Sequence, residues 1–259
     1  MKKSVLSLVV ILTLGVQFAV GQSKKESCDA SCNHNKLKTQ SVLFEKGKVY
    51  EIAYAEVVPE KVEQLSTQYF PKALKISAEY GGKLIASFNV VKNESKNFPA
   101  QMIAVFEWPN AEARQSLLKD KEFQKITYLR DEALKSIQLG YFQVQESKTI
   151  TFRSDKVYEF GAADLVKNGF EKLKKYNEIA EPYKRNYGGT YPEFIISFDK
   201  ADSKGQATYV PQMQFIVEWA SIEDTEKLFA NKGFAKNALP VLMSSIDKFD
   251  AVFTNFSFE

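Results

Sequence analysis

The sequence contains 259 residues, and its 35 Lys and Arg residues nearly balance its 32 Asp and Glu residues. Because these charges are interspersed, we expect neither nucleic acid nor an anionic membrane surface as a partner. The single histidine, His34, precedes the predicted folded part. Ser-His-Asp hydrolysis, histidine-ligated haem and histidine-rich metal centres are therefore not expected there, and we predict neither a metal nor a cofactor.

The amino-terminal segment predicts export. Lys2 and Lys3 precede an apolar run, residues 5–20, that ends on small residues before Gln22. This is the pattern of a secretory signal peptide spanning residues 1–21, with a retained membrane anchor as the alternative. We expect a periplasmic or extracellular protein without a stable membrane anchor.

Both cysteines fall in residues 22–40, which we interpret as a flexible leader. In an oxidising compartment, a local disulfide between Cys28 and Cys32 is expected. The alternative is a metal clip completed by His34, although the spacing matches neither a zinc finger nor a haem-attachment motif.

The rest of the chain repeats itself, with one copy in residues 41–148 and the other in residues 149–259. Lys48-Val49-Tyr50-Glu51 matches Lys156-Val157-Tyr158-Glu159, and Glu107-Trp108 matches Glu218-Trp219 at a slightly larger offset. The change of offset indicates a short insertion in the second copy, around residues 199–205. A repeat of this length predicts a doubled domain instead of a solenoid.

The first copy predicts the order βαββαβ. Its expected elements are a strand at 49–57, a helix at 61–80, strands at 83–91 and 101–108, a helical stretch at 111–137 broken near Asp120, and a strand at 139–144. Gly81-Gly82 ends the first helix, and Asn110 and Ser221 are predicted N-caps in the two copies. Residues 42–44 predict an extra edge strand.

These elements predict an α+β fold of two tandem ferredoxin-like repeats. Each unit leaves one apolar sheet face uncovered, so we expect the two sheets to pack face to face. The result is an intrachain pseudodimeric α/β barrel. The 101–108 strand agrees with this arrangement, because apolar side chains occupy both of its faces. We expect a monomer with an internal pseudo-two-fold axis, and further assembly stays open.

Three motifs resemble a known family. Tyr80-Gly81-Gly82, the strand ending Phe106-Glu107-Trp108-Pro109 and the run from Phe123 to Arg130 resemble the dimeric α/β-barrel family called domain of unknown function 1330. More distantly, they resemble the antibiotic-biosynthesis-monooxygenase-like barrels. The resemblance covers nearly the whole mature chain and implies a fold and a cavity, without implying a reaction.

The sequence departs from that family at two places. Leu84-Ile85-Ala86-Ser87 stands where family members often carry an arginine, and Arg130 aligns with Val241 in the second copy. If the family's polar pocket is retained, the resemblance implies that it lies in the first half.

Glu107 and Glu218 are candidate site residues because each carboxylate ends an apolar strand. At a barrel mouth, burial could raise the pKa of Glu107 enough for acid-base catalysis or binding of a polar group. The alternative is a solvated or lysine-paired carboxylate with a structural role. Glu107 is thus the catalytic candidate, and both glutamates are candidate ligand contacts.

Arg130 and three aromatic residues complete the candidate ligand site. Arg130 could bind an anionic ligand or reach Glu107, and the alternative is a surface ion pair. Tyr54, Trp108 and Trp219 could line a pocket for a small apolar or aromatic ligand, or belong to the core.

These observations favour an exported, non-catalytic binding or accessory protein whose barrel encloses a small apolar cavity. One alternative is a cofactor-free monooxygenase-like or isomerase-type enzyme that uses a barrel carboxylate. Another is a structural or interaction module with a filled barrel.

Overall fold

The computed structural model describes residues 37–95, 97, 99–187 and 196–258. The predicted signal peptide (1–21), Cys28, Cys32 and His34 lie outside these residues.

Eight antiparallel strands close into a barrel in the order β10-β3-β4-β2-β5-β8-β9-β7. The first repeat supplies β2 (Val49–Val57), β3 (Lys83–Asn93), β4 (Met102–Trp108) and β5 (Leu134–Gln143). The second supplies β7 (Val157–Leu165), β8 (Ile196–Lys200), β9 (Met213–Trp219) and β10 (Ile246–Phe256). The predicted barrel of two ferredoxin-like repeats is confirmed.

The two repeats close the barrel by reciprocal pairing. The last strand of the second repeat pairs with the second strand of the first, through Val252↔Asn93 to Phe256↔Phe88. In the same way, the last strand of the first repeat pairs with β8, through Phe142↔Lys200. Closure gives each edge strand of one repeat a partner in the other, which satisfies its backbone hydrogen bonds.

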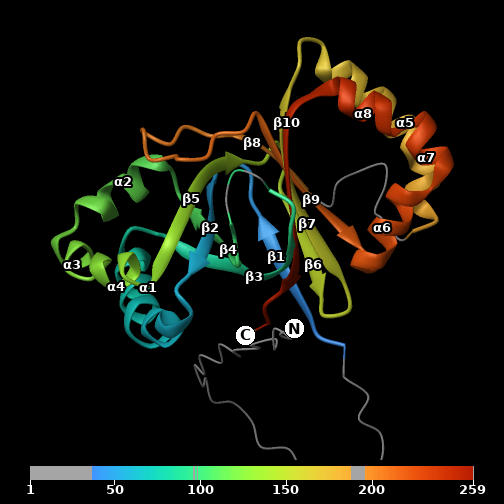
Figure 1. Ribbon diagram of the computed structural model, residues 1–259. Helices are drawn as coiled ribbons and strands as arrows, with labels where there is room; N and C mark the ends of the chain where they lie inside the picture. The colour runs from blue at the N-terminus through green and yellow to red at the C-terminus, as the bar shows by residue number, and fades with distance from the viewer. Residues whose placement is uncertain (1–36, 96, 98, 188–195, 259) are drawn as a thin grey trace, which may run out of the picture. The chain divides into compact units, whose positions relative to one another are not determined.

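A separate two-stranded ribbon contributes to the barrel core. β1 (Thr39–Phe44) pairs with β6 (Lys148–Arg153) in antiparallel register. Phe44 and Phe152 are fully buried, and the Phe152 ring stacks on Phe256 with a centroid distance of 4.6 Å. The predicted strand at 42–44 is therefore present, but it pairs within this ribbon and not at the edge of the large sheet (Figure 1).

Aromatic and aliphatic side chains occupy the space between the two sheets. Side chains alternate along a strand, so Tyr50, Ile52 and Tyr54 of β2 point inward while Glu51 and Ala53 point outward. The inward residues join one buried cluster that also contains Phe88, Ile103, Val105, Phe142, Phe160, Phe198, Ile216 and Val252. An apolar cavity enclosed by the barrel was expected; ring packing occupies much of that space, and the candidate pocket lies outside the barrel interior.

Helices cover the outer face of each half of the barrel (Figure 1). The first repeat carries α1 (Phe70–Glu79), α2 (Ala111–Lys119), α3 (Lys121–Gln124) and α4 (Thr127–Asp131). The second carries α5 (Gly169–Arg185), α6 (Ile222–Ala230), α7 (Lys232–Asn237) and α8 (Leu239–Ser245). Among the described residues, none of these helices combines the length and hydrophobicity that a bilayer-spanning segment requires.

The predicted caps set the helix boundaries. Asn110 accepts a hydrogen bond from the Ala113 backbone N–H at 2.8 Å, and Ser221 accepts one from Asp224 at 3.1 Å. Asp120 accepts from the Phe123 N–H and separates α2 from α3, as predicted. The helical stretch predicted at 111–137 ends at Asp131, so the prediction that it continued to Ile137 was wrong. Pairing of β5 with β2 recruits that segment into the sheet.

The first predicted helix, residues 61–80, is not uniform. A 3-10 turn (Pro59–Lys61) and a π-helical segment (Gln64–Tyr69) precede α1. Pro71 lies in the first turn of α1 and has no N–H to give to the preceding turn. A wider turn accommodates this loss, and π-helical turns are frequent at functional sites. Gly81, at φ +76°, then ends the helical segment as predicted.

Candidate functional site

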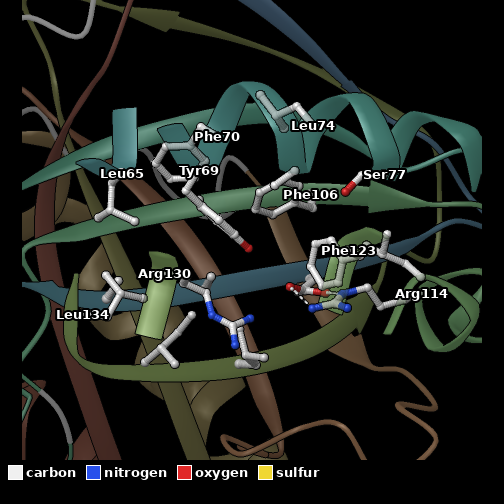
Figure 2. Close-up of a pocket in the computed structure, with 18 of the residues that line it drawn as sticks. Leu65, Tyr69, Phe70, Leu74, Ser77, Phe106, Arg114, Phe123, Arg130 and Leu134 are labelled. Atoms are coloured by element: carbon white, nitrogen blue, oxygen red, sulfur yellow. Dashed lines mark hydrogen bonds and ion pairs between the residues drawn. The ribbon is translucent and has the colours of Figure 1, made fainter. Parts of the chain in front are cut away.

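A pocket lies between the outer face of the first repeat's sheet and the helices that cover it (Figure 2). Its volume is about 80 Å³. Ala53 and Ala104 form part of its floor, and Leu65, Tyr69 and Phe70 form part of its wall. Since about 10–15 Å³ suffices for one water, the space can hold several waters or a small organic molecule.

Two alanines open the pocket. Ala53 of β2 pairs directly with Ala104 of β4. In the second repeat, the matching pair is Gly161 and Phe215. A Cβ atom on Gly161 would lie 2.1 Å from Phe215 Cε2, so the phenylalanine ring occupies the space directly above the glycine. The same position in the fold is thus filled by a ring in one repeat and left open in the other.

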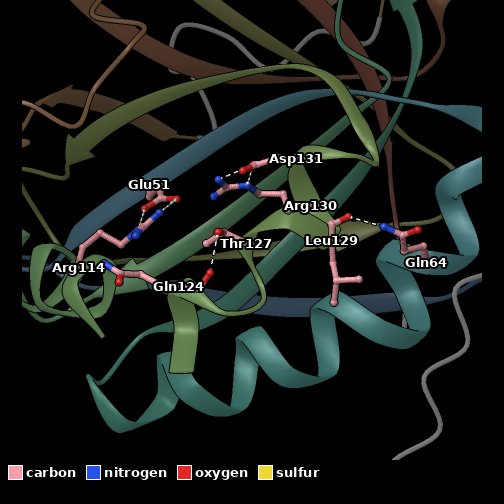
Figure 3. Close-up of polar contacts among 8 residues, drawn as sticks. All are labelled: Glu51, Gln64, Arg114, Gln124, Thr127, Leu129, Arg130 and Asp131. Atoms are coloured by element: carbon pink, nitrogen blue, oxygen red, sulfur yellow. Dashed lines mark hydrogen bonds and ion pairs between the residues drawn. The ribbon is translucent and has the colours of Figure 1, made fainter. Parts of the chain in front are cut away.

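A buried ion pair borders the pocket. Arg114 of α2 donates from Nε to Glu51 Oε2 at 2.5 Å and from Nη2 to Oε1 at 3.4 Å (Figure 3). The Tyr141 hydroxyl donates to Glu51 Oε2 at 2.9 Å. Arg114 is 5% exposed and Glu51 is 4% exposed. Burial lowers the pKa of the Arg114 guanidinium, but the charge of Glu51, the hydrogen bonds to Glu51 and the nearby Tyr141 and Tyr69 together outweigh it, so the pKa is raised. Arg114 therefore remains a cation.

Two buried N–H donors at this site have no hydrogen-bond partner among the described residues: Arg114 Nη1 and Trp108 Nε1. Both residues line the pocket, and the guanidinium carbon lies 5.5 Å from the centre of the Trp108 ring. In the second repeat, Trp219 Nε1 instead donates to Glu159 Oε2 at 2.8 Å. Buried donors without an acceptor are uncommon, and they identify a place where an acceptor can bind.

Tyr69 and Arg130 approach one another across the pocket (Figure 2). Burial raises the pKa of the Tyr69 hydroxyl, although the charges of Arg130 and Arg114 partly oppose this. The hydroxyl therefore stays protonated and can donate. Arg130 gives Nε and Nη2 to Asp131 Oδ1 at 2.8 and 2.7 Å, and its side chain is 23% exposed. It combines the predicted ion pair with a position in the pocket wall.

Of the six predicted ligand contacts, Trp108 and Arg130 lie together at this pocket. Glu107 does not, because it lies on the opposite face of β4 from Trp108. Its carboxylate is at the end of the barrel interior, next to Tyr50, and its Oε1 is 3.9 Å from Lys83 Nζ.

The other three predicted contacts lie elsewhere. Glu218 mirrors Glu107, accepting from the Tyr158 hydroxyl at 3.4 Å. Tyr54 is buried inside the barrel, where its ring meets Tyr209 edge-on with a centroid distance of 5.6 Å. Trp219 lies under the helices of the second repeat, hydrogen-bonded to Glu159.

Sequence reasoning missed Glu51, Tyr69 and Arg114. One usable signal was internal: Arg114 aligns with Thr225, and Ala104 aligns with Phe215 in strands that share Met, Glu and Trp at matching positions. The second copy thus lacks the arginine charge and has a larger side chain in the strand. These differences indicate that the helix-sheet interfaces of the two copies have different roles.

A second hollow, of about 280 Å³, opens beside Tyr209 and Asp250. Asp250 already accepts hydrogen bonds from Ser95, Asn97 and Tyr209 at 2.7, 2.7 and 2.8 Å. Its acid group is therefore satisfied within the protein. Across the described ranges, no group of three or more His, Cys, Asp or Glu side chains is arranged to hold a metal ion.

No model of a known protein family matches the chain, and no curated protein matches it. Its fold is similar to that of an anthrone oxidase-like protein at 12% identity and a TM-score of 0.54, covering 83% of this chain and 94% of that one. A mutant chlorite dismutase from Candidatus Nitrospira defluvii has 9% identity and a TM-score of 0.49, covering 83% and 92%. The similarity to the anthrone oxidase-like protein concerns the fold alone, and no family model supports the finer resemblance to domain of unknown function 1330.

Proposed function

We propose that this chain is an exported protein that binds a small, mostly apolar molecule in the pocket of the first repeat. The observation that carries the proposal is the contrast between Ala53–Ala104 and Gly161–Phe215. The fold accepts a ring at this position, as the second repeat demonstrates. The first repeat leaves the position empty, although filling it would stabilise the protein.

The chemistry of the walls supports a ligand more specific than a hydrocarbon. Most lining side chains are apolar, and the polar ones are few: Glu51, Tyr69, Ser77, Arg114, Arg130 and the indole of Trp108. An apolar pocket with a few placed polar groups is typical of small-molecule sites.

The test transfers the packing of the second repeat to the first. Ala53→Gly with Ala104→Phe should fill the pocket and abolish ligand binding, while the fold and thermal stability are kept. Native mass spectra of the protein from its own host should show an adduct on the wild type that disappears on denaturation. The double variant should lack that adduct.

Gly161→Ala with Phe215→Ala is the matched control, because it makes the reverse exchange in the other repeat. It should lower stability by about 3–5 kcal/mol and keep the adduct. A folded Ala53→Gly/Ala104→Phe variant that binds as much ligand as the wild type would place the site elsewhere. A wild type with no adduct under any growth condition, and no binding to small aromatic probes, would contradict the proposal.

A second candidate function is catalysis on the bound molecule without a cofactor, of the monooxygenase-like or isomerase type. The anthrone oxidase-like neighbour shares the fold, and the unpartnered Arg114 donor favours this candidate because a fixed N–H can stabilise negative charge that develops during a reaction. Incubating the identified ligand with protein in air, followed by mass spectrometry of the ligand, separates the two candidates. An unchanged ligand supports binding alone, and a product that Ala53→Gly/Ala104→Phe fails to make supports catalysis.

A further inference from the structure

We infer that the pocket selects an aromatic ligand in its deprotonated form, with an ionised oxygen accepting hydrogen bonds from Arg114 Nη1 and Trp108 Nε1. This inference rests on the proposed function and names the ligand class of the same site: a phenolate or an aryl carboxylate of about one ring.

The unsatisfied groups at the site are donors. Arg114 Nη1 and Trp108 Nε1 are buried without a partner in the part of the chain that the structure describes, and each belongs to a residue that is at most 5% exposed. Glu51, the carboxylate that lines the pocket among the described residues, already accepts hydrogen bonds from Arg114 Nε, Arg114 Nη2 and the Tyr141 hydroxyl. A ligand that satisfies this site therefore supplies an acceptor.

The geometry of the guanidinium directs its charge toward the ligand. Arg114 uses its Nε–Nη2 edge for Glu51, so the planar group turns its Nη1 hydrogens away from that carboxylate. The Nη1 group carries part of the positive charge of the guanidinium, and it lies in a buried site. Hydrogen bonds from a charged donor to a charged acceptor are about twice as strong as neutral ones, which favours an ionised oxygen over a neutral hydroxyl.

Comparison with the second repeat indicates that the unpartnered donors of Arg114 and Trp108 belong to a ligand site in the first repeat. There, Thr225 replaces the arginine, and Trp219 Nε1 binds the matching carboxylate, Glu159, directly. In the first repeat Arg114 binds Glu51, and the Trp108 N–H is left for another acceptor. The exchange of Thr225 for Arg114 thus coincides with the exchange of Phe215 for Ala104: the open space and the free donors occur together.

The walls restrict the rest of the ligand. Phe106, Phe123 and Tyr69 surround a space of about 80 Å³, which suits a flat aromatic group more than a flexible chain. Arg130 stands on the far side with its Nε–Nη2 edge committed to Asp131. Its remaining nitrogen can contact a second polar substituent of the ring.

The test uses two probes of matched shape and the full-length mature protein. 4-Nitrophenol ionises near neutral pH, and its phenolate absorbs visible light, so the ionisation of the bound probe can be read directly. Nitrobenzene lacks the ionisable oxygen. The wild type should lower the apparent pKa of bound 4-nitrophenol by about one unit or more, and it should bind the phenolate at least about tenfold more tightly than nitrobenzene.

Two variants isolate the donors. Trp108→Phe keeps a ring and removes an N–H that has no partner, so it should fold and reduce the phenolate preference several-fold. Glu51→Gln with Arg114→Met removes both charges together and should eliminate the pKa shift while nitrobenzene binding persists. Trp219→Phe is the matched control in the second repeat, and it should leave both affinities at the first-repeat pocket unchanged.

The outcomes separate this inference from the proposed function. A wild type that binds nitrobenzene but excludes the phenolate, or binds both equally, overturns the inference and leaves the proposed function standing. A phenolate preference that survives in Glu51→Gln/Arg114→Met also overturns it. A wild type that binds neither probe contradicts both.

Discussion

The Glu51–Arg114 pair places two opposite charges in the interior of the first repeat, where each depends on the other. Removing both polar groups also removes both desolvation costs, whereas removing one leaves an uncompensated charge. The energetic role of the pair therefore becomes visible when single and double substitutions are compared.

Arg114→Met should lower the free energy of unfolding by about 3–5 kcal/mol, because it leaves the Glu51 carboxylate buried without its cation. Glu51→Gln with Arg114→Met should lower it by less than Arg114→Met alone. Urea denaturation of the four proteins in this cycle measures the coupling.

The exposed pair Arg185–Glu181 provides the control, since its N–O distance of 2.7 Å is also short but both side chains are at least 39% exposed. Arg185→Met should change stability by about 0.5 kcal/mol or less. Additive effects of the Glu51 and Arg114 substitutions would contradict a coupled pair.

The sequence predicted part of the site at the level of single residues. Trp108 and Arg130 were identified because they are a large aromatic and a charged residue in recognisable motifs. Glu107 and Trp108 were wrongly grouped, although neighbouring residues of a strand face opposite sides. Arg114 was missed for a different reason: on a helix of mixed charge, nothing local distinguishes an arginine that meets a buried carboxylate from one that meets solvent.

Helix α5 of the second repeat buries a cation, Lys184, whose charge interacts with that of Glu159 on strand β7. Lys184 is 7% exposed, and its Nζ lies 5.0 Å from the centre of the Tyr176 ring. Burial lowers the pKa of Lys184 to about 8, against the opposing charge of Glu159. Burial likewise raises the pKa of Glu159, and its hydrogen bond from Trp219 opposes that change.

The buried Lys184 should make the free energy of unfolding depend on pH in the alkaline range. Lys184 releases its proton at a pKa of about 8 in the folded state, against an ordinary lysine pKa of 10.5. Between these values the unfolded state binds more protons, so the free energy of unfolding rises with pH. From about pH 7.5 to 9.5, the wild type should gain on the order of 2 kcal/mol relative to Lys184→Met.

Urea unfolding of both proteins at several pH values measures this difference. Taking the difference removes contributions from tyrosines and other lysines that titrate in the same range. A wild type that loses stability relative to Lys184→Met as the pH rises would show that the lysine is held protonated.

Most elements could be predicted, because strand alternation, helical periodicity and capping residues are local signals. Asn110, Asp120 and Ser221 set helix boundaries at the expected places. The failures came from longer-range effects. Pairing with β2 drew residues 134–137 into β5, and Pro71 changed the start of the first helix into a π-helical segment. The partner of β1 lies more than a hundred residues away in β6, and no local pattern identifies it.

At the scale of the whole molecule, the barrel core belongs to both repeats at once. Phe88 of the first repeat contacts Phe160 and Phe256 of the second, with ring centroids 4.7 and 5.2 Å apart. Neither half can unfold without exposing the inward face of the other. The repeats should therefore unfold together.

The two tryptophans allow each half to be followed separately. Trp219→Phe leaves Trp108 as the reporter of the first repeat, and Trp108→Phe leaves Trp219 as the reporter of the second. In each variant, the fluorescence and far-UV circular dichroism transitions in urea should coincide. A fluorescence midpoint that departs from the circular dichroism midpoint in either variant would reveal repeats that unfold independently.

The contrast between the filled and the open helix-sheet interface also bears on how a duplicated gene can acquire a new task. A void of about 80 Å³ costs on the order of 2 kcal/mol, a large fraction of the stability of a small domain standing alone. In the fused chain, the packing of the copy with Phe215 can offset the stability that the open position at Ala104 costs. Duplication followed by fusion would thus let one repeat maintain stability while the other acquires ligand binding. A single large-to-small substitution at Phe215 would then be the first step toward a protein with two binding sites.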